Sequence, residues 1–585
     1  MKKRIVLILF FCFSSSLFAQ KNNDLHKLFE DYFEASLQLN PLKASAIGDH
    51  RYDHLYPNAI SVEHRQKSRV HYQNYLNRLS NIDYRELSDE DRLSYDLLQY
   101  DLQIALAGRE YPSHLLPINQ MYAAPAMFAK LGSGADVHLF KTTKDYDNFL
   151  QRIDGFCIWV ETAISNMQEG IARGIVQPRL LIEKTLPQLQ AHLPDDPEES
   201  VFYKPIRNMP DSIPEADRRR LTQTYRTTII EKIFPAYREL HDFLRDGYLP
   251  HCRESVGISE IPGGHEWYKH DIRFHTTTDM TANEIHQLGL NEVKRISIEM
   301  EKVRKQVGFD GSLKKFFTHL REDERFYYDS ANDLMARYAA MKIEIDAKLP
   351  TLFGRLPKAD YELRIIEPYR EVTATTAHYQ RSSADGSRPG VFYVNTYNLK
   401  ARPKYTMMAL SLHEANPGHH FQIAIQQELE DLPRFRRFGS YYNAYIEGWA
   451  LYAESLGEEM GFYRDPYDYF GKLTYEMWRA LRLVVDTGLH AKGWTRQEAV
   501  HFMLARSSLT ETNINAEVDR YIAWPAQALS YKIGELKIHE LRRTAQSELK
   551  ENFDLKAFHD HILANGSLPL SILEKRTHEW IISRK

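Results

Sequence analysis

The stretch His413-Glu414-Ala415-Asn416-Pro417-Gly418-His419-His420 combines a His-Glu pair with two further histidines, and it follows a helix predicted over 405–412. In H-E-x-x-H zinc sites, two histidines four residues apart share one helix face, and the glutamate beside the first faces the water at the metal. Here position 417, where the second histidine would stand, is a proline. The ordinary motif is therefore absent, and a metal site in this stretch needs a different local backbone.

Pro417 and Gly418 favour such a backbone. Proline cannot donate the helical hydrogen bond to the carbonyl of His413, and glycine tolerates unusual backbone angles, so a bulge here would bring a later histidine back toward His413. On an unbroken helix His420 would lie roughly 10 Å along the axis from His413, too far for both to bind one ion at about 2.0–2.1 Å. We assign His419 as the second ligand, with His420 as the alternative and otherwise as a substrate contact.

A third ligand is expected from a second helix, and the segment Tyr445–Glu454 supplies Glu447. Apolar neighbours such as Ile446 and Leu451 indicate a mostly buried helix, in which a lone charge would be costly. Glu454, seven residues after Glu447, is either an outer support of the site or a surface carboxylate. The order of these residues therefore predicts a metal site shared by two helical segments.

Together the residues predict a hydrolase that holds one Zn²⁺ per chain. Two imidazoles and a carboxylate leave one coordination position open for water, whose pKa falls toward neutrality at zinc. Glu414 is expected to act as the general base that takes the proton of this water and delivers it to the leaving amine. The three predicted zinc ligands are His413, His419 and Glu447.

Two motifs carry a resemblance to known proteins. The run Glu-Gly-aromatic-Ala-x-Tyr from Glu447 resembles the third-ligand helix of gluzincin aminopeptidases. Together with HExxPGHHxQ, which ends at Gln422, it resembles the bacterial domain-of-unknown-function 885 family, grouped with gluzincin-type peptidases. The resemblance extends to Thr-Ala-His-Tyr and Arg-Pro-Gly-Val-Phe-Tyr-Val-Asn before His413, and to Arg520-Tyr521 and Pro525–Lys532 after it. Ala526 departs from the family pattern, which has glycine there.

The resemblance implies a helical fold around a substrate cleft, with a small sheet whose edge strand pairs with an extended peptide. Phe392–Asn395 would be that strand, which makes Tyr393 and Asn395 substrate contacts. It also implies a phenol that stabilises the tetrahedral oxyanion. Tyr531 is our first candidate for this role, and Tyr521, otherwise a substrate contact, is the second.

Arg520 is a further candidate contact for the substrate. Arginine matches a carboxylate with two parallel hydrogen bonds, so Arg520 is predicted to bind a substrate carboxylate. The alternative is a simple ion pair with its neighbour Asp519.

Most of the chain has helical periodicity. Apolar residues recur every three or four positions from Leu25 to Tyr111 and from 216 to 253, as in amphipathic helices. A further helix is expected after Thr281, a predicted N-cap with Glu284 three residues on. Six prolines between 186 and 214 exclude a continuous helix there.

The segment 361–398 has a different character, with short β-like runs separated by Asp385-Gly386 and Pro389-Gly390. We therefore expect a mainly α fold with a small antiparallel sheet next to the helix that carries His413. Three parts are predicted: a signal peptide over 1–19, a helical region over 20–355 that forms one side of the cleft, and a catalytic region over 356–585.

The N-terminus has the character of a cleaved signal peptide. Basic residues precede an apolar run from Ile5 to Phe13 that is too short to span a bilayer, and cleavage is expected after Ala19. A lipoprotein form anchored at Cys12 is less favoured, because the bulky Phe11 precedes it. No later segment is apolar over enough residues to cross a membrane. We therefore expect export to the periplasm or outside the cell.

Composition narrows the classes of partner. The 585 residues include 75 basic and 79 acidic side chains for a net charge of −4, so no electrostatic feature favours nucleic acid. After removal of the signal, Cys157 and Cys252 are the remaining cysteines and no C-x-x-C pair exists. Zinc binding through cysteine is therefore excluded.

The sequence favours zinc-dependent hydrolysis of peptide bonds in short peptides. The same residues would also serve a zinc hydrolase of a non-peptide amide or ester. A third possibility is an inactive, zinc-containing periplasmic protein that binds peptides, and Glu414 argues against it because binding alone needs no general base. Carboxypeptidase and oligopeptidase types, and every oligomeric state, are compatible with the sequence.

Overall fold

The computed structural model describes residues 23–121, 124–367, 371, 375–384, 386, 388–439 and 441–585. The predicted signal peptide, with Cys12 and Ala19, lies outside these residues. Over the described range the chain is mainly α-helical with one small three-stranded sheet, which confirms the predicted fold class. None of the described helices combines the length and the apolar character that a bilayer-spanning helix needs.

The chain divides into two compact units. Unit 1 takes in the chain up to Glu254 together with Pro433–Ser440, and unit 2 takes in Ser255–Leu432 and Tyr441–Lys585. The boundary expected after residue 355 therefore falls inside unit 2. The physical reason is that helices before this point pack along the helices that carry the predicted ligands, so they belong to the same compact body.

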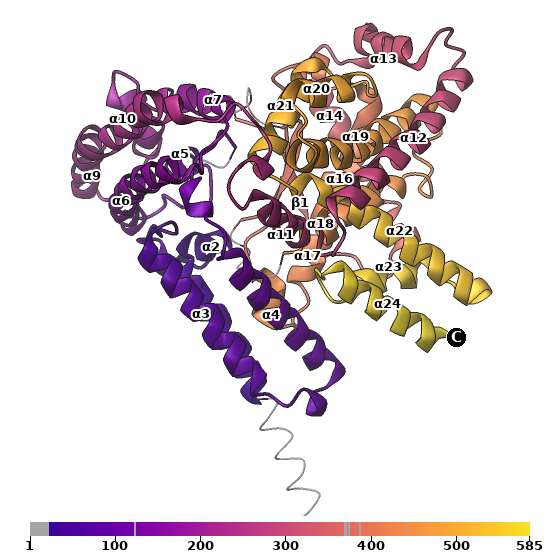
Figure 1. The fold of residues 1–585 in the computed structure, drawn as a ribbon, viewed down its shortest axis with the longest axis horizontal. Coiled ribbons are helices and arrows are strands. Elements are labelled where there is room, and N and C mark those ends of the chain that lie inside the picture. Colours follow the sequence, from indigo (N-terminus) through magenta and orange to yellow (C-terminus); the bar gives the residue numbers. More distant parts are fainter. Residues whose placement is uncertain are drawn as a thin grey trace, which may run out of the picture. The chain divides into compact units, whose positions relative to one another are not determined.

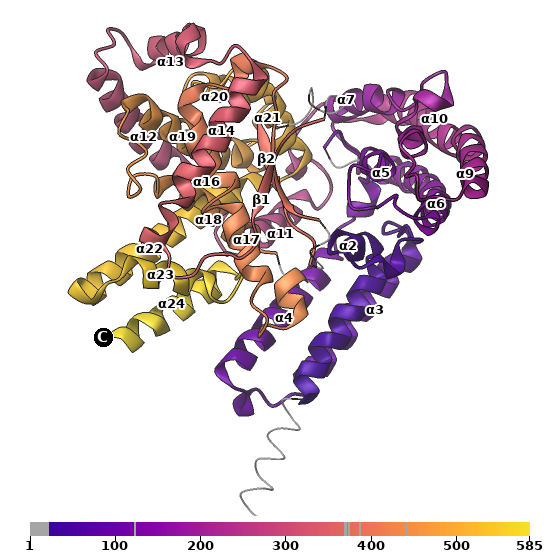
Figure 2. The ribbon, with the colours of Figure 1, turned by 180° about the vertical axis from the view of Figure 1, so that it is seen from behind.

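The regular secondary structure of unit 1 is helical. Its helices are 23–39, α2 (Pro41–Ala46), α3 (Val62–Ser80), α4 (Asp89–Gly108), α5 (Ala124–Gly132), α6 (Thr143–Arg173), α7 (Arg179–Gln190), α8 (Lys204–Arg207), α9 (Glu215–Thr228) and α10 (Phe234–Asp242). Helices α3 and α4 run side by side (Figures 1 and 2). Between α7 and α9 the chain forms only short helical turns, as its prolines predict.

Helix α6 shows why these residues form helices. Thr142 and Asp145 cap its first turn reciprocally, and Gly174 ends it in the left-handed conformation with a φ of 67°. Its buried face includes Phe149 and Phe156, which belong to the core of unit 1. Unit 1 is thus a helical body with a core of its own.

Unit 2 holds the sheet and every predicted ligand. Its helices are α11 (Gly264–Thr276), α12 (Ala282–Gln306), α13 (Leu313–Glu322), α14 (Ala331–Asp346), α15 (Leu349–Leu352), α16 (Met407–Glu414), α17 (His419–Gln427), α18 (Asn443–Ser455), α19 (Pro466–Ala491), α20 (Arg496–Leu504), α21 (Glu511–Ala523), α22 (Ser530–Leu549), α23 (Leu555–Leu563) and α24 (Leu570–Arg584). The predicted capping box of Thr281 and Glu284 starts α12. The most extensive helix contacts join α12 to α19 and α18 to α22.

Two glycines allow α18 and α22 to approach closely. A Cβ atom at Gly448 would lie 2.5 Å from the backbone of Gly534, and one at Gly534 would lie 1.8 Å from the carbonyl oxygen of Ala444. Neither position has room for a side chain. This contact sets the spacing between Glu447 on α18 and Tyr531 on α22.

Replacing Gly534 with alanine is expected to destabilise the protein by about 1–3 kcal/mol, because the new methyl group must push the two helices apart. The measurement is the midpoint of urea unfolding. Ser547→Ala, on an exposed part of the same helix, is the matched control and should leave the midpoint nearly unchanged. An unchanged midpoint in Gly534→Ala would contradict the close packing.

The sheet consists of β1 (Tyr361–Ile365), β2 (Ala377–Gln380) and β3 (Gly390–Val394) in the spatial order β1-β3-β2. Strands β2 and β3 are antiparallel, but β1 and β3 are parallel. The sheet is therefore mixed, and the prediction of a purely antiparallel sheet is wrong for β1. The physical reason is that β2 follows β1 along the chain and runs opposite to β3. The chain therefore reverses once more before β3, which places β3 parallel to β1.

The prediction that Phe392–Asn395 forms an edge strand is also wrong. Strand β3 is paired on both sides and all five of its residues are buried, so its backbone cannot pair with a peptide. The edges are β1, which contacts α14, and β2, which contacts α16 (Figure 2). The edge that faces the predicted His-Glu helix is therefore β2.

Candidate metal centre

Three predicted ligands meet in unit 2. His413 lies near the end of α16, His419 begins α17, and Glu447 lies on α18. Oε2 of Glu447 is 3.7 Å from Nε2 of His413 and 3.3 Å from Nε2 of His419. One ligand atom from each of the three residues lies within 4.8 Å of the others. The arrangement brings two imidazoles and one carboxylate around a common point.

The helix breaks between His413 and His419, where the sequence predicts a bulge. Helix α16 ends at Glu414 and α17 begins at His419. A Cβ atom at Gly418 would lie 1.9 Å from the carbonyl oxygen of His413, so only glycine allows the chain to fold back this closely. The indole N–H of Trp449 donates a 2.8 Å hydrogen bond to the carbonyl of Pro417, which fastens the break to α18.

His420 points elsewhere. Its Nδ1 is 3.0 Å from the hydroxyl of Tyr379 and its Nε2 is 3.1 Å from the carbonyl oxygen of Ala359. The ring is buried, and this burial lowers the pKa of His420 to about 4. His420 is thus a neutral residue that holds the sheet against α17, and of the two histidines it is His419 that joins the cluster.

The cluster fits a bound cation. Oε2 of Glu447 is buried and has no hydrogen-bond partner among the described residues, although two imidazole nitrogens face it. Burial opposes both charges, yet the carboxylates of Glu447 and Glu454 raise the pKa of His413 to about 9, and the two histidines lower the pKa of Glu447 well below its usual range. Two nitrogens and one carboxylate oxygen are a donor set that suits zinc with one position open.

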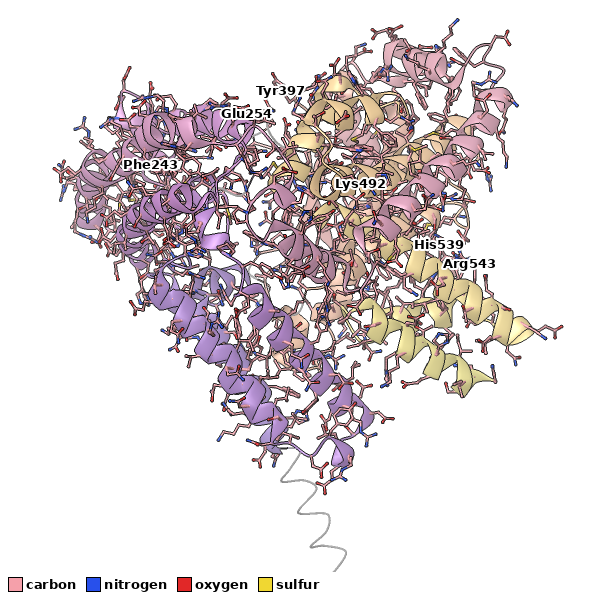
Figure 3. All side chains as sticks on the ribbon, in the orientation of Figure 1. Phe243, Glu254, Tyr397, Lys492, His539 and Arg543 are labelled. Atoms are coloured by element: carbon pink, nitrogen blue, oxygen red, sulfur yellow. The ribbon has the colours of Figure 1, made fainter. Side chains whose placement is uncertain are left out.

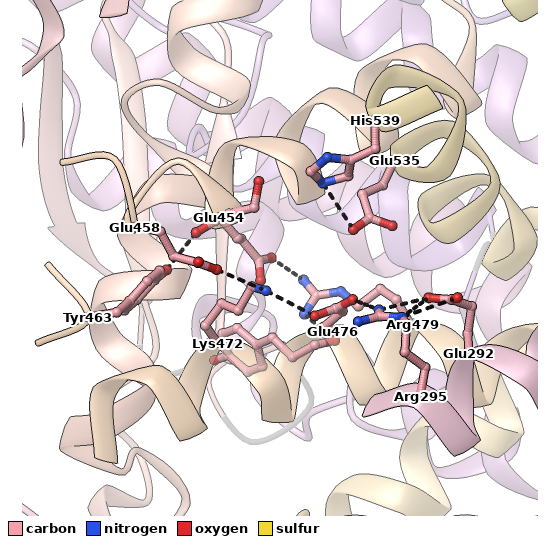
Figure 4. Close-up of polar contacts among 12 residues, drawn as sticks. Glu292, Arg295, Glu454, Glu458, Tyr463, Lys472, Glu476, Arg479, Glu535 and His539 are labelled. Atoms are coloured by element: carbon pink, nitrogen blue, oxygen red, sulfur yellow. Dashed lines mark hydrogen bonds and ion pairs between the residues drawn. The ribbon is translucent and has the colours of Figure 1, made fainter. Parts of the chain in front are cut away.

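Glu454 supports the cluster from behind. Its Oε1 lies 2.8 Å from Nδ1 of His413 and 3.2 Å from a guanidinium nitrogen of Arg479, and Figure 4 shows the contact with Arg479. A carboxylate at Nδ1 fixes the tautomer of a histidine so that its Nε2 is free for the metal. Of the two roles the sequence allowed for Glu454, the buried support is therefore the one that the structure shows.

Replacing Glu454 with glutamine is expected to lower zinc affinity about 10- to 100-fold, since it removes the charge that orients His413. Competition with a calibrated chelator measures this affinity. Glu458→Gln is the control, because Glu458 lies one turn further on and pairs with Lys472 instead (Figure 4). Equal affinities in the two variants would contradict a supporting role for Glu454.

Glu414 is anchored to the sheet. Its Oε2 accepts a 2.9 Å hydrogen bond from the backbone N–H of Tyr379 in β2. This N–H points away from β3, so the outer edge of β2 faces Glu414. This contact could not be predicted from the sequence, since β2 has too few residues for a clear alternation of apolar and polar side chains.

The two candidate tyrosines differ in position. The ring of Tyr531 stacks near that of His413, with centroids 6.4 Å apart, and burial together with the charge of Glu447 raises the pKa of Tyr531. Tyr521 is fully buried, and its hydroxyl accepts hydrogen bonds from Trp478 and Arg482. Of the two phenols, Tyr531 is therefore the one beside the cluster.

Arg520 is engaged within the protein. Its Nε and Nη2 lie 3.3 Å and 3.0 Å from Oε2 of Glu517, and its Nη1 donates a 2.7 Å hydrogen bond to Gln527. Asp519, the partner considered from the sequence, pairs with Arg496 instead. Adjacent residues on a helix point in different directions, so Arg520 finds the carboxylate three positions earlier.

Tyr393 and Asn395 belong to the scaffold of the sheet. Tyr393 is buried on the central strand and stacks against His378 with centroids 5.1 Å apart. The side-chain amide of Asn395 donates to the carbonyls of Glu371 and Thr375. These contacts follow from the central position of β3, which the sequence did not reveal.

Tyr441 is a residue near the centre that sequence patterns missed. The residue as a whole is 47% exposed. Desolvation of its hydroxyl raises the pKa of Tyr441, Arg381 opposes the shift, and the charges of Glu447 and Glu414 add to it. The guanidinium of Arg381 lies 5.2 Å from the ring centroid of Tyr441. No spacing rule links Tyr441 to the motif that starts at Tyr445. The chain has 35 tyrosines, and no signal in the sequence distinguishes this one from the others.

Ala526 occupies a backbone position that suits the glycine of the family pattern. Its φ is 65°, in the left-handed region that favours glycine. Its N–H donates to both carboxylate oxygens of Asp486, at 3.1 Å and 3.2 Å. The loop before α22 thus keeps a conformation suited to glycine although the residue is alanine.

Comparison with known proteins gives a family and a fold. A family model described as "Bacterial protein of unknown function (DUF885)" matches residues 41–577. No curated protein matches the chain. A solved candidate lipoprotein from Colwellia psychrerythraea is 27% identical, with a TM-score of 0.90 over 96% of this chain and 99% of its own.

A solved candidate lipoprotein of unknown function from Shewanella oneidensis is 19% identical, with a TM-score of 0.72 over 94% of this chain and 99% of its own. At this identity the likeness concerns the fold alone. None of these descriptions states an activity, so the likeness to gluzincin peptidases stays a prediction. The family match spans both units and includes His413, His419 and Glu447. The chain belongs to the DUF885 family of bacterial proteins of unknown function.

Proposed function

We propose that the protein is a zinc-dependent peptidase that hydrolyses short peptides. The observation that carries the proposal is the convergence of His413, His419 and Glu447 on one point, with Glu414 adjacent in the chain. Two imidazoles and one carboxylate would leave a position for water on a bound zinc, and a glutamate next to the first histidine suits the task of a general base.

The residues have separate tasks in this mechanism. When bound, zinc supplies Lewis acidity, which polarises a carbonyl and lowers the pKa of water. Glu414, oriented by the N–H of Tyr379, takes a proton from the attacking water and passes it to the nitrogen of the leaving amine. The hydroxyl of Tyr531, beside His413, donates a hydrogen bond to the oxyanion that forms on the scissile carbonyl.

The outer edge of β2 is the proposed docking edge for the peptide. The N–H of Tyr379 at this edge already donates to Glu414, so an extended substrate that pairs with the remaining outward backbone groups of β2 would pass directly beside the general base. Backbone pairing of this kind supplies affinity without requiring one particular sequence. Strand β2 thereby takes the role that the sequence had suggested for β3.

Two alternatives use the same residues. A zinc hydrolase of a non-peptide amide or ester needs the same base and oxyanion donor. A peptide-binding protein without turnover needs the edge of β2 but not Glu414 in contact with it, so the 2.9 Å bond to Tyr379 favours an enzyme.

Export is part of the proposal. The two solved structures are described as candidate lipoproteins, a class of exported protein. The basic and apolar N-terminus of this chain predicts export as well. We propose release to the periplasm or outside after cleavage at Ala19, with a lipid anchor at Cys12 as the less favoured form.

The direct test incubates the zinc-loaded mature protein with a mixture of short peptides and follows the products by mass spectrometry. New peptide fragments that disappear after chelation and return with zinc are expected. A parallel mixture of esters and non-peptide amides separates the first alternative. Tight binding of peptides with no cleavage of any compound would favour the binding protein and end the peptidase proposal.

A further inference from the structure

A buried cluster beside Tyr531 carries more positive than negative charge. Guanidinium nitrogens of Arg482 and Arg520 lie 3.2 Å and 3.0 Å from the same oxygen of Glu517. Although burial opposes ionisation, these two groups lower the pKa of Glu517 to about 2. Glu517 is therefore ionised, and one carboxylate faces two cations.

The neighbouring acids do not correct this imbalance. Among the described residues Glu517 is the acid that pairs with Arg482. Of the other buried acids around it, Asp519 pairs with Arg496 and Glu454 with Arg479. Asp486 accepts hydrogen bonds from Tyr268 and from the N–H of Ala526, and burial raises its pKa to about 7 although Arg520 opposes the shift, so it supplies at most part of a counter-charge at neutral pH. A buried charge without its own counter-charge is costly.

The three guanidinium nitrogens of Arg482 differ in their hydrogen bonding. Its Nε donates to the hydroxyl of Tyr521 at 3.2 Å, and its Nη2 donates to Glu517. Its Nη1 is buried and has no hydrogen-bond partner in the described part of the chain. An anion that accepts a hydrogen bond from Nη1 would relieve both the unpaired donor and the surplus charge.

Arg482 stands beside the candidate metal centre. Its Cζ lies 4.3 Å from the ring centroid of Tyr531, and that ring in turn stacks near His413. Tyr531 is partly exposed, so the cluster borders accessible space. An extended peptide advances about 3.3–3.6 Å per residue, so a group one or two residues beyond a carbonyl at the centre comes within reach of Arg482.

We propose that Arg482 binds a carboxylate of the substrate on the leaving side of the scissile bond, and that this carboxylate is the peptide's own C-terminus. The inference rests on the proposed peptidase function and gives it a direction, namely cleavage close to a carboxyl end. Arg482 replaces Arg520 in this role, because each nitrogen of Arg520 already has a partner.

The test measures binding and not turnover. Metal-stripped wild-type protein is titrated calorimetrically with an N-acetylated tripeptide as its free acid, with the C-terminal amide of that peptide, and with an amide that carries glutamate as its last residue. We expect the free acid to bind roughly 10- to 100-fold more tightly than the plain amide. If the glutamate amide binds as tightly as the free acid, the carboxylate is recognised but its source is a side chain.

Variants of Arg482 test whether this residue causes the preference for the free acid. In Arg482→Met the free acid and the plain amide should bind equally, and Arg482→Lys should keep part of the preference because it keeps the charge. Arg520 still balances Glu517 in Arg482→Met, so this variant is expected to fold, which its thermal unfolding checks. Arg543→Met is the matched control, because Arg543 lies exposed on α22, the helix of Tyr531 (Figure 3).

Two results would overturn the inference: equal or undetectable binding of acid and amide by the wild type, or a preference that survives in Arg482→Met. Because stripped protein cannot turn over, the two proposals fail separately. Acid preference without hydrolysis would remove the peptidase function alone, whereas zinc-dependent cleavage that ignores the carboxyl terminus would remove the role of Arg482 alone.

Discussion

Glu414→Gln is expected to reduce kcat for peptide hydrolysis by about 10²–10⁴-fold while leaving zinc bound, because a positioned general base contributes this much to catalysis. Glutamine keeps the size of the side chain and can still accept the 2.9 Å hydrogen bond from the N–H of Tyr379. It cannot take a proton from water. The change therefore removes the proton transfer and preserves the surroundings.

The measurement combines steady-state hydrolysis of the best peptide from the screen with elemental analysis of the same sample. Glu430→Gln, an exposed carboxylate shortly after α17, serves as the control and should behave as the wild type. Full activity in Glu414→Gln would end the assignment of Glu414. Loss of zinc together with activity would instead mean that this carboxylate helps to hold the metal.

The meeting of His413, His419 and Glu447 could be predicted because its signals are local. His413, His419 and Glu447 each stand in a short motif, and Pro417 with Gly418 excludes a regular helix between the two histidines. Elementary geometry then requires a bulge, which the structure places between α16 and α17. Which of His419 and His420 faces His413 depends on how closely the chain folds back between α16 and α17. The close approach of Gly418 to the carbonyl of His413 determines this.

The remainder of the site depends on contacts between distant segments. Strand β2 is four residues long, and its edge position follows from pairing with β3, so the link from Tyr379 to Glu414 cannot be read from either segment alone. The same holds for Arg482, whose partners Glu517 and Tyr521 lie on α21. Local periodicity predicts that a helix exists, but it does not say which of its polar residues face one another.

The second large effect concerns the ligands themselves. His413→Ala, His419→Ala and Glu447→Ala should each abolish stoichiometric zinc binding, while His420→Ala should retain about one zinc per chain. His420 is the matched control, because it is the next residue after His419 and equally a histidine, yet its ring faces Tyr379 and Ala359. Elemental analysis of dialysed protein after zinc loading distinguishes the four variants.

Thermal unfolding gives an independent readout of the same prediction. A ligand that binds only the folded state stabilises it by about 2.7 kcal/mol at a hundred times its dissociation constant, so zinc should raise the unfolding temperature of the wild type and of His420→Ala but not of the other three. His420→Ala itself starts lower, since it loses two buried contacts. Zinc that stabilises Glu447→Ala as much as the wild type would place the metal elsewhere, because Oε2 of Glu447 is the atom toward which both imidazoles converge.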